Sequence, residues 1–335
     1  MKYAFWQTPK AGSLNRLSKH HSELGPLHPA HIRVDVDAIG LNFADIFAVT
    51  GLYSATPSGA FTPGLEFAGR IADVGNEVDH YAIGDRVMGL CRFGGYSTVI
   101  DATADMLWPI PDNWSISQGA GHLVQALTAC YALHELGNVH PGQRVLIHSA
   151  AGGVGLRAMA ICRALRVDAI GTVGSKEKQS LMADLGYSNV WVRQGNMAQQ
   201  LADQTFDLVL DAIGGQVQWN SFHRLRPMGR MVVFGAATFT PRSHRPNYLR
   251  AAWQYLRRPR YDVMSMISSN RSVMAFNLIW LWQQRHKITP MLAHLDALDI
   301  GPPLISRSFD FDQAPQALQY LQSGQSIGKI VLITR

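Results

Sequence analysis

The 335-residue sequence has few cysteines and few charged residues, and both shortages narrow the class of protein. Cys91, Cys130 and Cys162 are widely spaced and odd in number, which argues against a disulfide framework and favours a reducing compartment such as the cytoplasm. Charged residues make up only 16% of the chain while 47% of residues are hydrophobic, and this balance is that of a globular protein rather than a disordered one.

The sequence also lacks an apolar run long enough to span a membrane. Its longest candidate, SVMAFNLIWLW at 272–282, falls short of the ~18 residues that a span requires, and the first ten residues lack a signal-peptide core. The net charge of +6 favours anionic ligands, but the charge is too diffuse to indicate nucleic acid. We therefore expect a cytoplasmic protein without a nucleic-acid partner, and we disfavour a membrane contact.

Two styles of sequence divide the chain. The first ~120 residues contain short strand-like runs between turns, and HIRVDVDAIG at 31–40 alternates apolar residues as a half-buried strand does. Only NFADIFAV at 42–49 looks helical before residue 115. From Gln143 onward, apolar runs alternate with helical segments at 153–165, 176–185, 197–204 and 217–225. That alternation predicts an α/β protein with a parallel sheet covered on both faces.

The last part of the chain returns to a mixed pattern. It predicts helices near 282–297 and 313–323 and strands near 303–309 and 329–334. These elements are expected to complete the first domain. The predicted domains are therefore residues 1–123 together with 280–335, and a parallel-sheet domain at 124–279.

The most informative stretch is RVLIHSAAGGVGLRAM, a strand followed by a glycine turn and a helix. It matches the pattern G-x-G-x-x-G with Ala150 in place of the first glycine. A glycine at 152 lets the backbone approach a pyrophosphate, and Gly155 lets the helix pack closely on the strand. Because the loop lies within repeated strand–helix units, it predicts a dinucleotide site. We expect the backbone of five residues to bind the phosphates: Ala151, Gly152, Gly153, Val154 and Gly155.

The end of the second strand bears on which dinucleotide binds. An NAD site usually has an acid there that holds the ribose 2′-hydroxyl, but this chain reads GTVGSKEK. Ser175 stands at the expected position, and Lys178 and Arg193 are cations that could reach a 2′-phosphate. This combination favours NADPH, although each cation alone could equally be a solvated surface charge.

Several motifs together resemble those of a known family. NFADI, PGLEFAGRIADVGNEV, GDRV, AAGGVG and GKIVLI look like the medium-chain dehydrogenase/reductase family in its zinc-free quinone-reductase branch. The basic insert followed by NRSVMAFNLIWL is similar to the subgroup of vesicle amine transport protein homologues. The resemblance implies a GroES-like, β-rich catalytic domain, a doubly wound Rossmann domain inserted in the chain, and an active site in the cleft between them.

The resemblance also implies that no metal is bound. Zinc-dependent relatives have ligands where this chain has Asn42, Leu65 and Val124–Gln125, and none of these can replace a zinc ligand of the usual kind. Glu66 is then expected to bond buried backbone or to pair with a cation, rather than to act as an acid. Four histidines have no metal-ligand spacing and are expected to be solvated or core residues: His20, His21, His122 and His148.

By the same resemblance, further residues are carried over from the family to this chain. Tyr53 and Asn42 are the candidate catalytic residues, and Asp45 either lines the nicotinamide end or caps a helix. The remaining candidate cofactor-binding residues are Asn42, Thr128, Phe234, Gly235, Phe276 and Lys329. Hydride from NADPH would add to a quinone or an α,β-unsaturated carbonyl, with a proton from Tyr53 or from water.

Three alternatives remain open at this stage. The Arg-rich insert 241–262, with six arginines and four aromatic residues, could instead bind a membrane surface or a partner protein. A zinc-dependent alcohol dehydrogenase is the least favoured reading. The apolar run at 271–281 predicts an edge strand through which two chains form a homodimer, unless the insert covers that edge within one chain.

Overall fold

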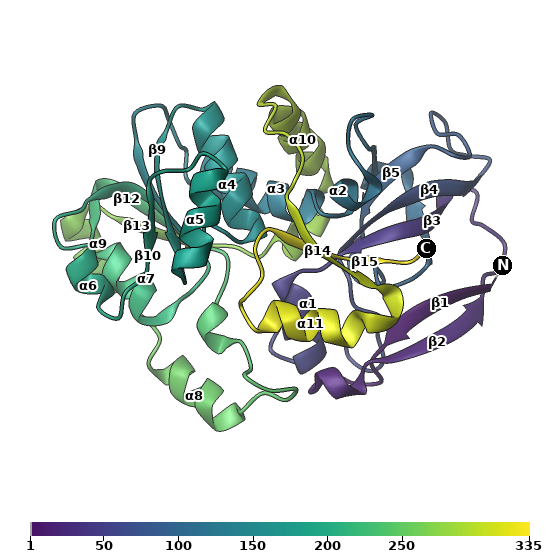
Figure 1. Cartoon of the computed structure of the whole chain (residues 1–335), viewed down its shortest axis with the longest axis horizontal. Coiled ribbons are helices and arrows are strands. Elements are labelled where there is room, and N and C mark those ends of the chain that lie inside the picture. The colour runs from purple at the N-terminus through teal and green to yellow at the C-terminus, as the bar shows by residue number, and fades with distance from the viewer. Residues whose placement is uncertain (1) are drawn as a thin grey trace. The chain divides into compact units, whose positions relative to one another are not determined.

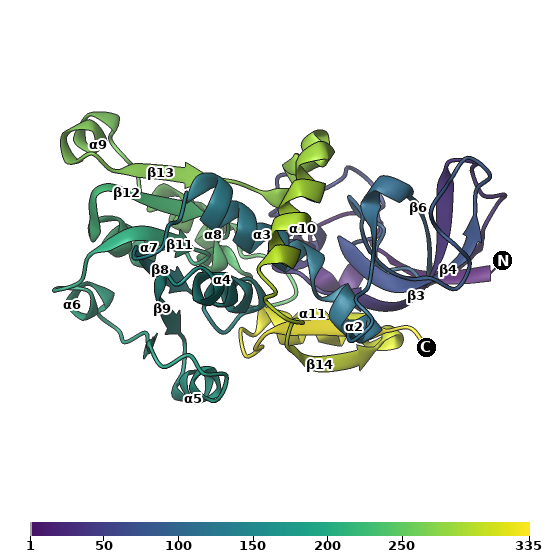
Figure 2. The same ribbon diagram turned by 90° about the horizontal axis from the view of Figure 1, so that it is seen from above.

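The computed structural model describes residues 2–335, which form two compact units. Unit 1 comprises the chain up to Val124 together with 241–246 and 302–335, and unit 2 comprises 125–240 and 247–301. Figure 1 shows the ribbon, and Figure 2 shows it turned by 90°. The return to the first domain therefore begins at residue 302 rather than at 280, because the helices that follow the last strand of unit 2 stay with that unit.

Unit 1 is built on a seven-stranded sheet with a separate two-stranded hairpin. The sheet has the order β14-β15-β3-β4-β5-β7, and β6 pairs with β3. Its strands are β3 (His31–Gly40), β4 (Glu66–Val74), β5 (Arg86–Leu90), β6 (Val99–Thr103), β7 (Leu107–Pro109), β14 (Ile305–Asp310) and β15 (Lys329–Ile333). The hairpin consists of β1 (Lys2–Gln7) and β2 (Ser18–Glu23).

The alternation predicted for 31–40 is present in β3. Ile32, Val34 and Val36 are fully buried in the apolar core of unit 1. The C-terminal segment completes this core, since β15 pairs antiparallel with β3 and α11 (Ala314–Gln322) buries Leu318. The expected closure of the first domain by the end of the chain is thus seen in the sheet itself.

Short helices and 3₁₀ turns accompany these strands. They are α1 (Phe43–Thr50), α2 (Ile116–Ala120), η1 (Leu14–Arg16), η2 (Ala104–Met106), η6 (Phe311–Gln313) and α3 (Leu123–Cys130), which continues into unit 2. Helix α1 begins with a capping box, in which Asp45 accepts a hydrogen bond from the backbone N–H of Asn42 at 2.8 Å. Such a box satisfies N–H groups that a helix start leaves without intrahelical partners.

Unit 2 contains a six-stranded, fully parallel sheet in the order β10-β9-β8-β11-β12-β13. Its strands are β8 (Arg144–His148), β9 (Asp168–Val173), β10 (Val190–Val192), β11 (Phe206–Asp211), β12 (Leu225–Val233) and β13 (Ser272–Ala275). The chain order reverses between β8 and β11, so this junction is the topological switch point at which α/β sheets bind ligands.

Helices connect the strands of unit 2, as the sequence pattern predicted. They are α4 (Gly153–Ala164), α5 (Lys176–Asp184), α6 (Met197–Gln200), α7 (Gly215–Phe222), α8 (Tyr248–Leu256), α9 (Val263–Ser269) and α10 (Ile288–Ala297). The non-α helices are η3 (Tyr131–Leu136, a π-helix), η4 (Ala237–Phe239) and η5 (Leu278–Lys287). Among the described residues, no helix has the length and apolarity needed to cross a membrane.

Several predicted boundaries were wrong. The run at 271–281 is a strand only over Ser272–Ala275, because β12 ends at Val233, the partner of Ala275, and a 3₁₀ helix follows. The segment at 282–297 is 3₁₀ up to Lys287, with a kink at Gln284, and α-helical only from Ile288. Helix α7 ends at Phe222 because Leu225 already begins β12.

Helix α8 of the Arg-rich insert contains no buried residue, whereas Tyr261 near the end of the insert packs on Phe222, with ring centroids 4.7 Å apart, and its hydroxyl lies 3.8 Å from Met231 Sδ. Helices α8 and α9 contain no buried residue. Leu249 is 85% exposed and Leu256 is 67% exposed. Figure 1 shows α8 standing away from the strands of unit 2, while β13 is the last strand at its edge of the sheet. Helix α8 therefore does not cover this edge, whereas Tyr261 of the insert and Met266 of α9 pack against the same core cluster as Val273 of β13.

Candidate active site and dinucleotide-binding residues

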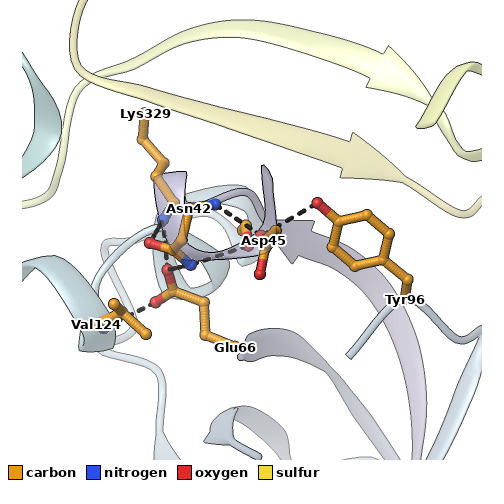
Figure 3. Close-up of polar contacts among 7 residues, drawn as sticks. Asn42, Asp45, Glu66, Tyr96, Val124 and Lys329 are labelled. Atoms are coloured by element: carbon orange, nitrogen blue, oxygen red, sulfur yellow. Dashed lines mark hydrogen bonds and ion pairs between the residues drawn. The ribbon is translucent and has the colours of Figure 1, made fainter. Parts of the chain in front are cut away.

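A buried ion pair between Glu66 and Lys329 stands at the centre of the polar residues of unit 1 (Figure 3). The Lys329 ammonium donates to Glu66 Oε1, and both side chains are 1% exposed. The second carboxylate oxygen, Oε2, accepts a hydrogen bond from the backbone N–H of Val124 at 2.9 Å. The partners expected for Glu66, a cation and a buried backbone group, are thus both present.

Asn42 connects to both members of this pair. Its amide Nδ2 donates to Glu66 Oε1 at 3.0 Å, and its Oδ1 accepts from Lys329 Nζ at 2.9 Å. Asn42 is the residue that precedes α1, and it is only 8% exposed. Glu66, Lys329 and Asn42 therefore form a closed triangle of hydrogen bonds, in which each group satisfies the other two.

Asp45 is the second buried acid of this region, and it is 1% exposed. Its Oδ2 accepts from the Asn42 backbone N–H and from the Tyr96 hydroxyl, which lies 3.1 Å away (Figure 3). Its other oxygen, Oδ1, is buried and has no hydrogen-bond partner among the described residues. Burial raises the pKa of Asp45 to about 7, although the bond from Asn42 opposes this rise. Asp45 thus caps the helix and titrates near neutrality.

The positions at which zinc-dependent relatives have ligands are occupied by other groups. Asn42 is bonded as described, Leu65 is a buried apolar side chain, and Val124 contributes its backbone N–H to Glu66. Within residues 2–335, no three or more His, Cys, Asp or Glu side chains are grouped as metal ligands would be.

In unit 2, the glycine loop that the sequence predicts to bind phosphate joins β8 to α4. A Cβ on Gly155 would lie 2.3 Å from the carbonyl oxygen of Ser149, and a Cβ on Gly153 would lie 2.0 Å from the Gln125 amide group. Glycine is required at 155, because the facing atom belongs to the backbone, whereas the flexible Gln125 side chain that faces Gly153 could move aside. Gly152 precedes the helix without a side-chain cap, so the first N–H groups of α4 are available to an anion.

The residues expected at the 2′-position of a dinucleotide lie together beyond β9. Ser175 caps α5 by accepting from the Lys178 N–H, and a Cβ on Gly174 would lie 3.4 Å from Arg193 Nη2. Burial, and then the nearby charge of Arg193, lowers the pKa of Lys178. Two partly buried cations therefore lie near a serine, and Glu177, an exposed acid of the same turn, forms a hydrogen bond with the Ser175 side chain, which lowers the pKa of the Glu177 carboxyl.

His148, which the sequence predicted to be a solvated or core histidine, is a core residue that lies beneath these cations. His148 Nδ1 and Nε2 lie 2.8 Å from the hydroxyls of Thr172 and Ser221, respectively. Thr172 in turn accepts from Arg193 through its carbonyl and hydroxyl oxygens, at 3.3 and 3.4 Å. Burial lowers the pKa of His148 to about 3, so the ring is neutral and belongs to the core. In the sequence, the only sign of this role is that His148 is a polar residue at the end of an apolar strand.

The remaining candidate residues divide between the units. Tyr53 is half-buried in unit 1, and Thr128 is 7% exposed on α3 in unit 2. Phe234 and Gly235 directly follow β12, and the Phe276 N–H donates to the Val233 carbonyl at 3.1 Å. The structure thus gathers Asn42 and Lys329 in unit 1. It places Phe234, Gly235 and Phe276 at neighbouring strand ends in unit 2.

Comparisons with known proteins agree with this architecture. Residues 28–112 match the family model of the alcohol dehydrogenase GroES-like domain, and residues 185–332 match the model named zinc-binding dehydrogenase. The synaptic vesicle membrane protein VAT-1 homolog of Rattus norvegicus is 30% identical over 312 residues, which are 91% of this chain and 77% of the relative. The Danio rerio homolog is 31% identical over 92% of this chain, and the chain spans 65% of that relative's length.

Among solved structures, the quinone oxidoreductase of Escherichia coli complexed with NADPH has a TM-score of 0.84 to this chain. The two are 25% identical over 99% of this chain and all of the other. A GroES-like unit and a parallel-sheet unit with a glycine phosphate loop define an oxidoreductase of the dehydrogenase class. The chain belongs to the medium-chain dehydrogenase/reductase family, in its zinc-independent quinone oxidoreductase branch near the VAT-1 homologues.

Replacing Asp45 with Asn should remove a pH dependence of stability. The native pKa of about 7 lies above the ordinary value of 3.8, so the folded state binds this proton more tightly than the unfolded state. Stability from this group is complete below about pH 4 and is lost as pH rises through 7. A tenfold difference in proton affinity between the folded and unfolded states corresponds to about 1.4 kcal/mol, so the effect should reach a few kcal/mol.

The measurement is urea unfolding of the wild-type protein and Asp45→Asn at pH 5 and pH 8. We expect the variant to lose less stability than the wild type between these values. Asp37→Asn, at a half-buried position of the neighbouring strand β3, is the control and should keep the wild-type dependence. An unchanged pH dependence in Asp45→Asn would show that this carboxyl is already charged at pH 5.

Proposed function

We propose that the protein is an NADPH-dependent reductase of quinones or α,β-unsaturated carbonyl compounds that works without a metal. The observation that carries the cofactor assignment is the strand end at 174–178, where Ser175, Lys178 and Arg193 gather beside the phosphate loop. An acid there would repel a 2′-phosphate, whereas a hydroxyl and two cations complement it.

Residues that follow successive strands of the parallel sheet would each hold one part of the dinucleotide. The loop at 151–155 and the start of α4 would hold the pyrophosphate, and the cationic corner would hold the 2′-phosphate. The backbone of Phe234 and Gly235, at the end of β12, would border the nicotinamide. When bound, NADPH supplies a hydride, and with one proton this reduces a quinone to its hydroquinone or an enone to a saturated ketone.

The acceptor must already be electron-poor, because no metal ligand set among the described residues could polarise it. The proton comes from the Tyr53 hydroxyl or from water. Asn42 is a positioning group in this proposal, since its amide is fully engaged by Glu66 and Lys329. Catalysis then depends on alignment of the reacting atoms and exclusion of water rather than on a strong acid.

NADPH should bind more than tenfold more tightly than NADH. Each charge-assisted hydrogen bond contributes about 1.5–3 kcal/mol, so Lys178→Ala should weaken NADPH binding by roughly tenfold or more and leave NADH nearly unchanged. Calorimetric titration of both cofactors provides the measurement. Lys176→Ala, on the exposed side of the same helix, is the matched control. Equal losses in both variants, or equal affinity for both cofactors, would contradict a 2′-phosphate site.

We also propose that the chain forms a homodimer through β13. This strand is an edge of the parallel sheet, and exposed apolar residues flank it, with Met264 and Ile267 of α9 at 68% and 67% exposure and Trp280 at 44%. An unpaired apolar edge favours strand addition, and a twofold axis would join two sheets into one.

Met274→Lys should therefore weaken the dimer, because a charge within the strand would be desolvated on pairing. Light scattering over a range of concentrations measures the mass. Leu185→Lys, an exposed position after α5, is the control and should leave the mass unchanged. A wild-type mass near the 37.0 kDa of one chain at all concentrations would overturn this proposal.

A second candidate function rests on helix α8, whose exposed face is both apolar and cationic. Leu249, Trp253 and Leu256 are 85%, 56% and 67% exposed, and the guanidinium of Arg257 lies 4.5 Å from the Trp253 ring centroid. From residue 212 through 261 the chain contains nine arginines and neither Asp nor Glu. We propose that this helix contacts an anionic membrane surface, because such a surface binds basic amphipathic helices with interfacial aromatic residues.

Vesicles that contain about 30% phosphatidylserine should then sediment with the protein in the absence of NADPH, and less so at high salt. Replacing Leu249, Trp253 and Leu256 together with serine should abolish most of this binding. Ile83→Ser, at a 70% exposed position of unit 1, is the control and should bind as the wild type does. Equal binding to neutral vesicles, or none to either kind, would contradict the proposal.

A further inference from the structure

Two histidines of unit 2 that are far apart in the sequence bring their rings into contact. His134 lies in the π-helix η3 and His294 lies in α10, and their ring centroids are 4.6 Å apart at an interplanar angle of 43°. Figures 1 and 2 both show α10 beside α3, the helix that leads into η3. Because π-helical turns are rare and occur frequently at functional sites, this pair is a candidate for a role beyond packing.

A carboxylate determines which nitrogen of His134 carries the proton. His134 Nδ1 lies 3.1 Å from Glu135 Oε1. An ionised carboxylate only accepts hydrogen bonds, so Nδ1 is the donor, and Nε2 of the neutral ring keeps its lone pair. Histidines that bind metals almost always donate their other ring N–H to such a partner. The side chains of His134 and Glu135 are 51% and 43% exposed, so an ion from solution can reach them.

His294 contributes a buried nitrogen that lacks a hydrogen bond. Its Nε2 is buried and has no hydrogen-bond partner within residues 2–335. A buried polar atom without a partner costs free energy, and native structures retain few of them. Burial, and next the neighbouring His134, lowers the pKa of His294, so this ring is neutral at pH 7 and can act as a ligand.

The separation of the two rings fits a pair of imidazoles bound to one ion. Bonds of about 2.0–2.1 Å from nitrogen to zinc place two ring centroids roughly 4.5–5 Å apart when the angle at the metal lies between a right angle and the tetrahedral angle. The observed 4.6 Å falls within this range. Only two ligands would come from the protein, which agrees with the absence of any group of three His, Cys, Asp or Glu ligands from the described residues. Water would complete the coordination on the exposed side.

A second histidine pair in unit 1 lacks these features. The ring centroids of His28 and His31 are 4.9 Å apart, but His28 Nδ1 accepts a hydrogen bond from the Ala30 N–H at 3.2 Å. In the described part of the chain, no carboxylate bonds to either ring and neither ring has a buried nitrogen without a partner. Ring separation alone therefore does not distinguish the two pairs, whereas the carboxylate and the buried nitrogen do.

We propose that His134 and His294 bind a divalent transition-metal ion at the surface of unit 2, with Glu135 orienting the His134 ring, and that the ion ties α10 to η3. Imidazole ligands suit Zn²⁺, Cu²⁺ and Ni²⁺ rather than Mg²⁺ or Ca²⁺. The site is separate from Asn42, Leu65 and Val124–Gln125, the positions at which zinc-dependent relatives have ligands. Its occupancy can be measured without cofactor or acceptor, so the result does not depend on the proposed reaction.

The experiment titrates zinc chloride calorimetrically into the 335-residue protein without cofactor. The wild type should bind one Zn²⁺ per chain. His134→Gln and His294→Gln should each weaken binding at least tenfold, and Glu135→Gln should weaken it about tenfold, the loss typical of a partner that orients a ligand. Zinc should also raise the unfolding temperature of the wild type but not of His294→Gln, because an ion that binds only the folded state stabilises it.

His31→Gln is the matched control, since it removes one ring from a pair of similar separation, and its zinc affinity should stay within twofold of the wild type. Circular dichroism without zinc checks that each variant is folded, and Mg²⁺ should produce no binding heat. No zinc binding by the wild type, or an equal loss in His31→Gln, would overturn the proposal. Wild-type affinity in the double variant His134→Gln/His294→Gln would assign the ion to other groups and would also overturn it.

Discussion

The buried ion pair of Glu66 and Lys329 is the constraint on which unit 1 depends. It joins the first residue of β4 to the first residue of β15, although 263 positions separate the two in the sequence. Asn42 and the backbone of Val124 complete the hydrogen bonds, so the start of α1 and the residue preceding unit 2 are tied to the same carboxylate. A pair of this kind contributes little net stability against an apolar alternative, but loss of one partner costs roughly 3–5 kcal/mol.

This pair also explains how the unit can do without a metal. Glu66 lies beside two positions at which zinc-dependent relatives have ligands, and a buried carboxylate needs a compensating positive charge. The ammonium of Lys329 supplies that charge directly, and Asn42 bonds to both members of the pair. The Glu66 carboxylate is therefore neutralised and hydrogen-bonded by protein atoms alone. Lys329 is the first residue of β15, so the pairing of β15 with β3 also brings the ammonium to Glu66.

Much of this could be predicted from the sequence because the signals are local. The glycine loop after a strand, the alternating apolar runs and the Gly-Ser pair at the end of β9 each lie within a few residues. The partner of Glu66 could not be named, because its distance along the chain leaves no periodic signal. The apolar run at 271–281 predicted a strand throughout because hydrophobicity does not show where pairing with β12 ends. The bonds of His148 to Thr172 and Ser221 likewise join three separate elements.

The parallel sheet of unit 2 separates two kinds of chemistry along one edge. Ser175 and Lys178 follow β9, and Arg193 follows β10. Arg193 donates to Thr172, whose hydroxyl is hydrogen-bonded to the neutral His148. Phe234 follows β12 and Phe276 follows β13, and these two neighbouring side chains are aromatic and uncharged. Because the strand order reverses between β8 and β11, these two sets lie on opposite sides of the glycine loop. In the proposed function, a dinucleotide would therefore lie along this edge in one direction, with its 2′-phosphate at the cations and its uncharged nicotinamide ring at the aromatic residues, away from that positive charge.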